Sequence, residues 1–211
     1  MLEEKLFNAV NSSTNIIMNS IIILFLSLLL FLGYSDSLKI NPFLSRRSII
    51  KYNTEKKVSE ELVKKAINAA VLAPNHFLTE PWRFYICGEK TKMKIFELNN
   101  DKKKYFESIP NWMVVTLKTD FLPNTKEYLE DYAACCAAIQ TFMLFMASNN
   151  VGSKWMTGGL QIKPSDILKI IDSNEEYFIG VIWFGYPEKE LSENTRSPLR
   201  KLGLSSLKFL D

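Results

Sequence analysis

The chain has 211 residues, of which 47% are hydrophobic and 12% aromatic. This length fits one domain, or one domain with an appendage, and the apolar content is too high for a disordered chain. The net charge of +3 is too small to argue for nucleic-acid binding, and we expect no nucleic-acid partner. Three cysteines cannot form a disulfide framework. The single histidine, His76, excludes a multi-histidine metal site within one chain, so we expect no metal.

The N-terminal region carries a long uncharged segment. Residues 6–35 contain no charged side chain, and residues 16–34 contain only three polar ones. About 20 apolar residues span a bilayer, so the segment is nearly long enough. A buried core helix is the alternative, but the apolar residues show no period of 3.6 that would define one buried face.

The same segment could be a membrane anchor or a secretory signal peptide. It lacks the basic n-region and the small-residue cleavage site of a signal peptide. The nearest positive charges, Lys39, Arg46 and Arg47, follow it, which favours an anchor with the following domain on the cytoplasmic side. A secreted or organellar protein after signal cleavage is the alternative. We therefore divide the chain into an N-terminal hydrophobic segment, residues 1–35, and a domain, residues 36–211.

Helices and strands alternate along the domain. Ser59 provides an N-cap, and the two acids that follow it fit the first turn of a helix that stops before Pro74. Aromatic and β-branched runs predict strands, and longer periodic runs predict helices. This order predicts a mixed sheet surrounded by helices, of the α+β or three-layer α/β class. We expect helices over residues 59–73, 90–99, 126–149 and 164–171, and strands over 82–87, 112–117 and 177–184.

The helix over residues 126–149 is unusually apolar. Between residues 132 and 147 only Gln140 and Thr141 are polar, so we expect a helix that is buried on all sides. Cys135 and Cys136 are most simply packing residues there. The helix carries more apolar surface than one domain core can cover, which predicts a homodimer.

Three polar segments could carry chemistry. In residues 45–48 two guanidiniums and two hydroxyls suit a phosphate, although a surface basic pair or a lipid-facing patch would look the same. Residues 73–84 form a loop between two prolines that carries His76 and leads into a strand. In residues 152–159 glycines flank an aromatic and a hydroxyl, which would let the backbone approach a flat ligand, or would simply form a connecting loop. The chain has no P-loop, G-x-G-x-x-G or G-x-S-x-G motif.

Together these segments resemble the flavin-dependent nitroreductases. The resemblance rests on Arg46-Arg47-Ser48, on Ala-Pro and Pro-Trp-Arg-Phe within residues 73–84, on Trp-x-Thr-Gly at 155–158, and on the strand and Gly-Tyr-Pro turn at 178–187. It covers residues 45–198 and looks most like the minimal bacterial members of YdjA type. It implies the nitroreductase-type α+β fold, with the hydrophobic N-terminal helix as an addition.

The resemblance also implies a function and a set of site residues. Members bind FMN at the interface of a homodimer and pass hydride from NAD(P)H to a small organic acceptor such as a nitroaromatic or a quinone. The flavin carries the redox chemistry, so no catalytic acid–base side chain is expected. Carried over by motif, the residues that bind the cofactor are Arg46, Arg47, Ser48, His76, Trp155, Met156, Thr157 and Arg196.

Two positions depart from the family pattern. Glu80 stands where many members have Gln before Pro-Trp, and Leu72 stands where minimal members often carry a basic residue. Each departure removes one expected flavin contact. They keep open the alternatives of a non-catalytic flavin-binding protein and of a cofactor-less, membrane-anchored interaction protein.

Overall fold

The computed structural model describes residues 41–191 and 207–210. The hydrophobic segment 16–34, the boundary at residue 35 and Arg196 lie outside the described residues. The elements, in chain order, are α2 (Pro42–Ser45), α3 (Glu60–Ala70), η1 (His76–Leu78), β1 (Trp82–Cys87), α4 (Glu89–Glu97), η2 (Asn100–Lys102), α5 (Lys103–Glu107), β2 (Asn111–Leu117), α6 (Lys126–Ser148), β3 (Gly152–Met156), η3 (Gly158–Leu160), α7 (Pro164–Ile170) and β4 (Tyr177–Gly185).

The four described strands form one sheet in the order β1-β2-β4-β3. The α+β class is confirmed, but the expectation of a mixed sheet is wrong for these strands, because every ladder is antiparallel. The reason lies in the connections. Two helices, α4 and α5, join β1 to β2 and return the chain to the end of the sheet where β1 stopped. The single helix α6 does make β2 and β3 run in the same direction, but β4 inserts between them.

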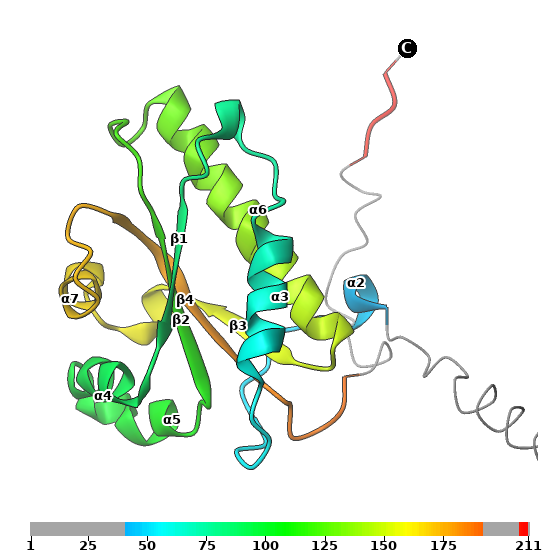
Figure 1. Cartoon of the computed structure of the whole chain (residues 1–211), viewed down its shortest axis with the longest axis vertical. Helices are drawn as coiled ribbons and strands as arrows, with labels where there is room; N and C mark the ends of the chain where they lie inside the picture. Colours follow the sequence, from blue (N-terminus) through cyan, green and yellow to red (C-terminus); the bar gives the residue numbers. More distant parts are fainter. Residues whose placement is uncertain (1–40, 192–206, 211) are drawn as a thin grey trace, which may run out of the picture. The chain divides into compact units, whose positions relative to one another are not determined.

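Helices cover both faces of the sheet (Figure 1). Helices α3 and α6 pack on one face, and α4, α5 and α7 pack on the other. Each face has its own core, because the residues of a strand point alternately to the two sides. Thus Trp112 and Trp183 face α4 and α5, whereas Met113 and Ile182 face α6.

The start of α3 follows the sequence expectation. The hydroxyl of Ser59 accepts a hydrogen bond from the backbone N–H of Leu62, and Glu60 and Glu61 lie in the first turn. Two small residues, Ala66 and Ala70, are fully buried and let α3 approach α6 closely. The strand that follows the loop after α3 has the predicted bounds, residues 82–87.

The long helix α6 is not buried on all sides. One face packs on the sheet through residues such as Cys135, Ile139 and Phe142, which have no exposed surface. Among the described helices, α6 alone is long and apolar enough to cross a membrane, and 50% of its apolar stretch is buried inside the fold. A second face is exposed or half-buried in the described part of the chain. We call it the open stripe of α6, formed by Leu129, Tyr132, Ala133, Cys136, Ala137, Gln140 and Leu144.

The segment after α6 is a strand and not the loop that its glycines suggested. Residues 152–156 pair with β4 along their whole length, which makes β3 an edge strand of the sheet. Gly152 is needed there for close packing, since a Cβ at this position would lie 2.6 Å from Cγ1 of Ile49. The sequence pattern missed this strand because it has five residues and only two of them are large and apolar.

Candidate functional site

The basic segment lies against the edge strand β3. Arg46 caps the short helix α2, and its backbone N–H donates to the carbonyl of Pro42. Two residues further on, Ser48 forms a parallel bridge with Ser153, and the N–H of Ile49 donates to the carbonyl of Ser153 over 3.1 Å. This pairing places Arg46, Arg47 and Ser48 beside the start of the 152–159 segment, so the structure brings two of the three predicted motifs together.

Two polar atoms in this region are buried without a hydrogen-bond partner. They are Nη1 of Arg47 and Oγ of Ser153, and neither is satisfied by any group in the described part of the chain. A buried guanidinium nitrogen without an acceptor costs free energy comparable to a lost hydrogen bond to a charged group. A phosphate oxygen is an acceptor that suits a guanidinium, and a hydroxyl such as that of Ser153 can pair with a sugar hydroxyl, so the chemistry of these residues fits the phosphate and ribityl end of FMN.

The aromatic residue of the third motif is held by β4. The indole N–H of Trp155 donates to the carbonyl of Ile179 over 3.3 Å. A Cβ at Gly180 would lie 2.2 Å from Nε1 of Trp155, so the ring occupies space that only glycine leaves. Met156 is buried in the core on the α4 side, whereas Thr157 is exposed. Three residues were expected to line a flat ring. The side chain of one of them, Met156, packs in the core instead.

Two residues that sequence reasoning missed fix the turn after Thr157. Nζ of Lys102 donates to the carbonyl of Gly159 over 2.7 Å, and Nδ2 of Asn99 donates to the carbonyl of Leu160 over 3.0 Å. Residues 102–104 are three consecutive lysines, a pattern that is typical of a solvated face. Nothing in its composition marks one lysine as a contact to a loop 57 residues away in the chain.

The loop that carries His76 has an unusual backbone. Phe77, Leu78 and Glu80 have φ angles of 48°, 56° and 44°, a left-handed conformation that costs free energy for residues other than glycine. Phe77 is 88% exposed and Leu78 is 79% exposed. Glu80, where many relatives have Gln, is exposed, and its N–H donates to Oδ1 of Asn75 over 3.0 Å. The loop thus presents an apolar tip to solvent in a strained shape.

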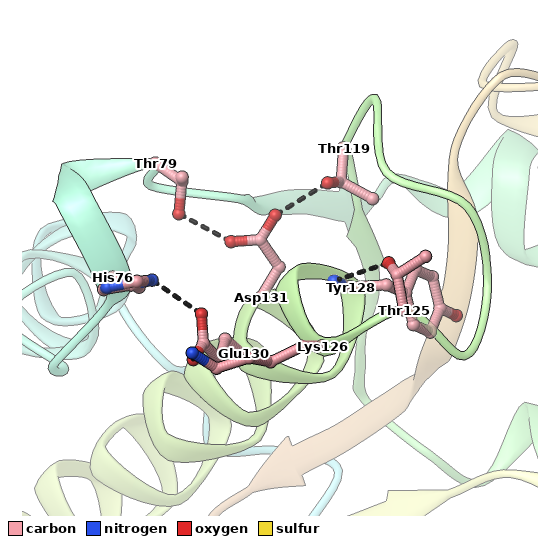
Figure 2. A network of polar contacts seen from close by, with 8 residues as sticks. All are labelled: His76, Thr79, Thr119, Thr125, Lys126, Tyr128, Glu130 and Asp131. Carbon is pink, nitrogen blue, oxygen red and sulfur yellow. Dashed lines mark hydrogen bonds and ion pairs between the residues drawn. The ribbon is translucent and has the colours of Figure 1, made fainter.

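Adjacent acidic residues on α6 hold this loop (Figure 2). Nδ1 of His76 lies 2.6 Å from Oε2 of Glu130. Oδ1 of the neighbouring Asp131 accepts from the hydroxyl of Thr79 over 2.6 Å, and its Oδ2 accepts from Thr119 over 2.7 Å. Asp131 is only 2% exposed, so this carboxylate clamps the His76 loop and the end of β2 to the helix. Sequence reasoning missed Asp131, whose one signal is an acid at the edge of an apolar run.

The His76 loop and the basic segment do not meet within one chain. His76 contacts the second turn of α6 at Glu130, whereas the basic segment pairs with β3, which begins after α6 has ended at Ser148. At a rise of about 1.5 Å per residue, about 27 Å of helix separates Glu130 from Ser148. Figure 1 shows α2 near the end of α6 that leads into β3. A site that uses both groups needs a second copy of the chain.

Side chains that could bind a metal ion do not cluster in the part of the chain that the structure describes. Within residues 41–191 and 207–210, no group of three or more such side chains could hold a metal ion. The described part of the chain is thus a three-layered α+β fold with the basic segment at its edge strand β3.

Comparison with known proteins identifies the family that this chain resembles. The model of the nitroreductase family matches residues 44–120. A relative from Bacillus subtilis, named "Putative NAD(P)H nitroreductase YfhC", is 27% identical over 173 residues, covering 74% of this chain and 88% of the relative. The resemblance to the nitroreductase family is therefore confirmed.

Solved structures give the same result for the fold. A nitroreductase-like family protein from Bacillus cereus superimposes with a TM-score of 0.68 at 27% identity, covering 81% of this chain and 95% of that chain. A protein described as a "putative nitroreductase in complex with FMN", from Exiguobacterium sibiricum, gives a TM-score of 0.67 at 15% identity, covering 81% and 96% of the two chains. The second likeness shows the shared fold.

Proposed function

We propose that this chain is an FMN-dependent oxidoreductase that transfers hydride from NAD(P)H to an organic acceptor such as a nitroaromatic or a quinone. The observation that supports the proposal is a pair of buried polar atoms without a partner in the described residues: Nη1 of Arg47, in the segment that the resemblance assigns to the flavin phosphate, and Oγ of Ser153, on the strand that this segment pairs with. The names of the relatives from Bacillus subtilis and Exiguobacterium sibiricum support both the nicotinamide donor and FMN.

The residues of this chain bind and orient, and the cofactor supplies the redox chemistry. When bound, FMN would supply the hydride-transfer chemistry between the two substrates. Arg46, Arg47 and Ser48 hold the phosphate and ribityl end. Trp155 and Thr157 would border the ring, and the side chain of Met156 is buried in the core on the α4 side. Arg196 is proposed as a further phosphate contact from the C-terminal region. No side chain is required as a general acid or base.

The proposed active site is completed by a second copy of the chain. The loop with His76 and the basic segment are about a helix length apart in one copy, so a homodimer is needed to bring one copy's loop to the other's basic segment. The open stripe of α6 supports this assembly, because a mostly apolar helix face that the described residues leave partly exposed favours a two-fold contact.

The N-terminal segment 16–34 is proposed to hold the protein at a membrane, with the flavin domain on the cytoplasmic side. Its support is the sequence alone: 30 uncharged residues, and positive charges that follow the segment. Fractionation of cells that make the full chain tests this part. Protein in the soluble fraction, or an N-terminus cut near residue 35, would contradict the anchor.

The decisive experiment for the function is the absorption spectrum of the purified full chain. We expect a yellow protein with one FMN per copy, and bleaching of the flavin when NADPH or NADH is added under nitrogen. Colour without bleaching would mean a flavin-binding protein without turnover. A colourless protein that takes up no added FMN would overturn the proposal in favour of an interaction protein.

Arginine substitution tests the location of the site. Replacing Arg46 or Arg47 by Ala should weaken FMN binding by about 1.5–3 kcal/mol, the usual contribution of a charge-assisted hydrogen bond. Lys104→Ala, an exposed basic residue on the α5 side of the sheet, is the matched control. An unchanged FMN affinity in both arginine variants would mean that these residues do not bind the phosphate and form only a basic pair.

A further inference from the structure

The contact between the His76 loop and α6 contains a buried carboxylate oxygen that the proposed function leaves unexplained. Oε2 of Glu130 is buried, and in the part of the chain that the structure describes its polar neighbour is Nδ1 of His76, at 2.6 Å. The other oxygen, Oε1, lies 3.5 Å from Nζ of the exposed Lys126. The closer contact of Glu130 is therefore the one with the imidazole.

This contact decides which ring nitrogen of His76 carries a proton. Two lone pairs would repel each other at 2.6 Å, so a hydrogen lies between Nδ1 and the carboxylate. An ordinary carboxyl group is a stronger acid than an imidazolium, so this hydrogen belongs to Nδ1. The hydrogen bond of one ring nitrogen sets the tautomer of a histidine. In neutral His76, Nε2 is then a hydrogen-bond acceptor without a proton.

Two further contacts hold the ring and its loop. The ring of Phe77 lies against the imidazole, with 4.1 Å between the centroids and 32° between the planes. Asp131 accepts a hydrogen bond from Thr79, which fixes the loop a few residues further on. Figure 2 shows the second ring nitrogen of His76 turned away from Glu130, and the side chain is 47% exposed. Nε2 is therefore the atom that His76 can offer to a ligand.

We infer that Glu130 is a positioning residue of the flavin site: it keeps the proton of neutral His76 on Nδ1, so that Nε2 accepts a hydrogen bond from the flavin. The inference rests on the proposed function, in which the loop of one copy meets the flavin held by the other. A lone pair at Nε2 fits the donors of the flavin, which are its ring N–H and its ribityl hydroxyls. It does not fit the phosphate, which offers acceptor oxygens.

The first test is nuclear magnetic resonance of the ¹⁵N-labelled full chain, purified without a histidine tag. His76 is the only histidine in the sequence, so its two ring nitrogens are assigned without ambiguity. Above the pH at which the imidazole loses its charge, we expect the proton on Nδ1 in the wild type and in Glu130→Gln, whose amide oxygen still accepts it. Glu130→Leu has no acceptor and should move the proton toward Nε2. A proton on Nε2 in the wild type would overturn the inference.

The second test measures flavin affinity by fluorescence. Glu130→Leu should bind both FMN and riboflavin, which lacks the phosphate, about three- to tenfold more weakly, the range of one neutral hydrogen bond. The loop stays attached in this variant, because Asp131 still holds Thr79. Glu130→Gln should remain within twofold of the wild type. So should the control Glu127→Leu, which removes an exposed acid from the preceding turn of α6.

A double-mutant cycle separates positioning from a general effect on the fold. In a His76→Ala background, Glu130→Leu should weaken flavin binding no further, because Glu130 acts through the imidazole. A further loss in that background would overturn the inference, and so would a Glu130→Gln variant as weak as Glu130→Leu. A loss for FMN with unchanged riboflavin affinity would place His76 at the phosphate and overturn it as well.

Lumiflavin, which has the ring without the ribityl chain, distinguishes the two donors. A loss in Glu130→Leu that persists with lumiflavin identifies the ring N–H, and a loss that disappears identifies a ribityl hydroxyl. A wild-type chain that binds no flavin would overturn the proposed function, and with it the flavin as the ligand of Nε2. The resonance experiment needs no flavin, so it decides separately whether Glu130 fixes the proton on Nδ1.

Discussion

At the scale of single residues, a close contact explains why β4 contains a glycine. The indole of Trp155 lies directly over Gly180, whose Cβ would fall 2.2 Å from Nε1 of Trp155 and 2.9 Å from the carbonyl oxygen of Met156. Gly180→Ala should lower the free energy of unfolding by about 1–3 kcal/mol, because overpacking forces a side chain and the backbone to move. Urea denaturation followed by tryptophan fluorescence measures this loss.

The matched control for that substitution is Gly158→Ala. A Cβ at Gly158 meets nothing within 4 Å. The free energy of unfolding of Gly158→Ala should therefore stay within about 0.5 kcal/mol of the wild type. Equal losses in the two variants would show that the Trp155 contact does not restrict position 180.

Asp131 makes a second residue-scale prediction. This buried carboxylate accepts hydrogen bonds from Thr79 and Thr119, as Figure 2 shows. Asp131→Ala leaves two hydroxyls without their acceptor and should cost about 2–4 kcal/mol, since bonds to charged groups contribute about 1.5–3 kcal/mol each and part is recovered from water. Chemical denaturation of Asp131→Ala, with the exposed neighbour Asp120→Ala as control, measures the effect. A loss below that of the control variant would contradict the clamp.

At the scale of elements, one buried thiol on α6 and one on β1 make the free energy of unfolding depend on pH. Burial raises the pKa of Cys135 to about 12 and that of Cys87 to about 11, from an ordinary value of 9.0. Between about pH 9 and pH 12 the unfolded chain has therefore lost thiol protons that the folded chain keeps. The unfolded state then binds fewer protons, so stability falls as the pH rises through this range.

The measurement is the free energy of unfolding by urea at pH 7, 9 and 10 under reducing conditions. We expect a decline above pH 9 and a shallower decline in Cys135→Ala, which removes one titrating group. Burial also raises the pKa of Tyr52, which acts in the same direction and stays in both proteins. A stability that rises from pH 9 to pH 10 would contradict this account.

At the scale of the whole molecule, the open stripe of α6 predicts that the chain forms a homodimer through this helix face. Leu129 is 54% exposed and Tyr132 is 40% exposed, although both belong to a helix whose other face is fully buried. Ala133→Glu places a charge in the middle of this stripe. We expect a monomer by light scattering, together with loss of bound flavin, because the proposed site needs loops from two copies.

Asn100→Glu, a charge added at an exposed position outside α6, is the control and should remain dimeric. If Ala133→Glu stays dimeric and keeps its flavin, the homodimer contact does not run along the stripe. If wild-type protein is monomeric at micromolar concentration with flavin still bound, the two-copy site is wrong as well.

The sequence alone determined the elements whose signals are local. Ser59 with its following acids set the start of α3, the aromatic run set β1, and the uninterrupted apolar residues set the length of α6. The order of short motifs also indicated the nitroreductase family, because each motif depends on a few residues that are adjacent in the chain. The residue-by-residue site stays a prediction, and Arg196 lies outside the described residues.

The tertiary structure decided whatever depends on which segments meet. Strand β3 is short and weakly apolar, and it forms because β4 offers it a partner. The sheet is antiparallel because α4 and α5 together connect β1 to its antiparallel neighbour β2, and because β4 inserts between the two strands that run in the same direction, β2 and β3. The contacts of Asp131 and Lys102 join positions that are 52 and 57 residues apart, and a cavity between residues 47–51 and 187–189 joins the two ends of the domain. Sequence patterns report a side chain's type and its neighbours along the chain, whereas these contacts exist only once distant backbone segments are fixed in space.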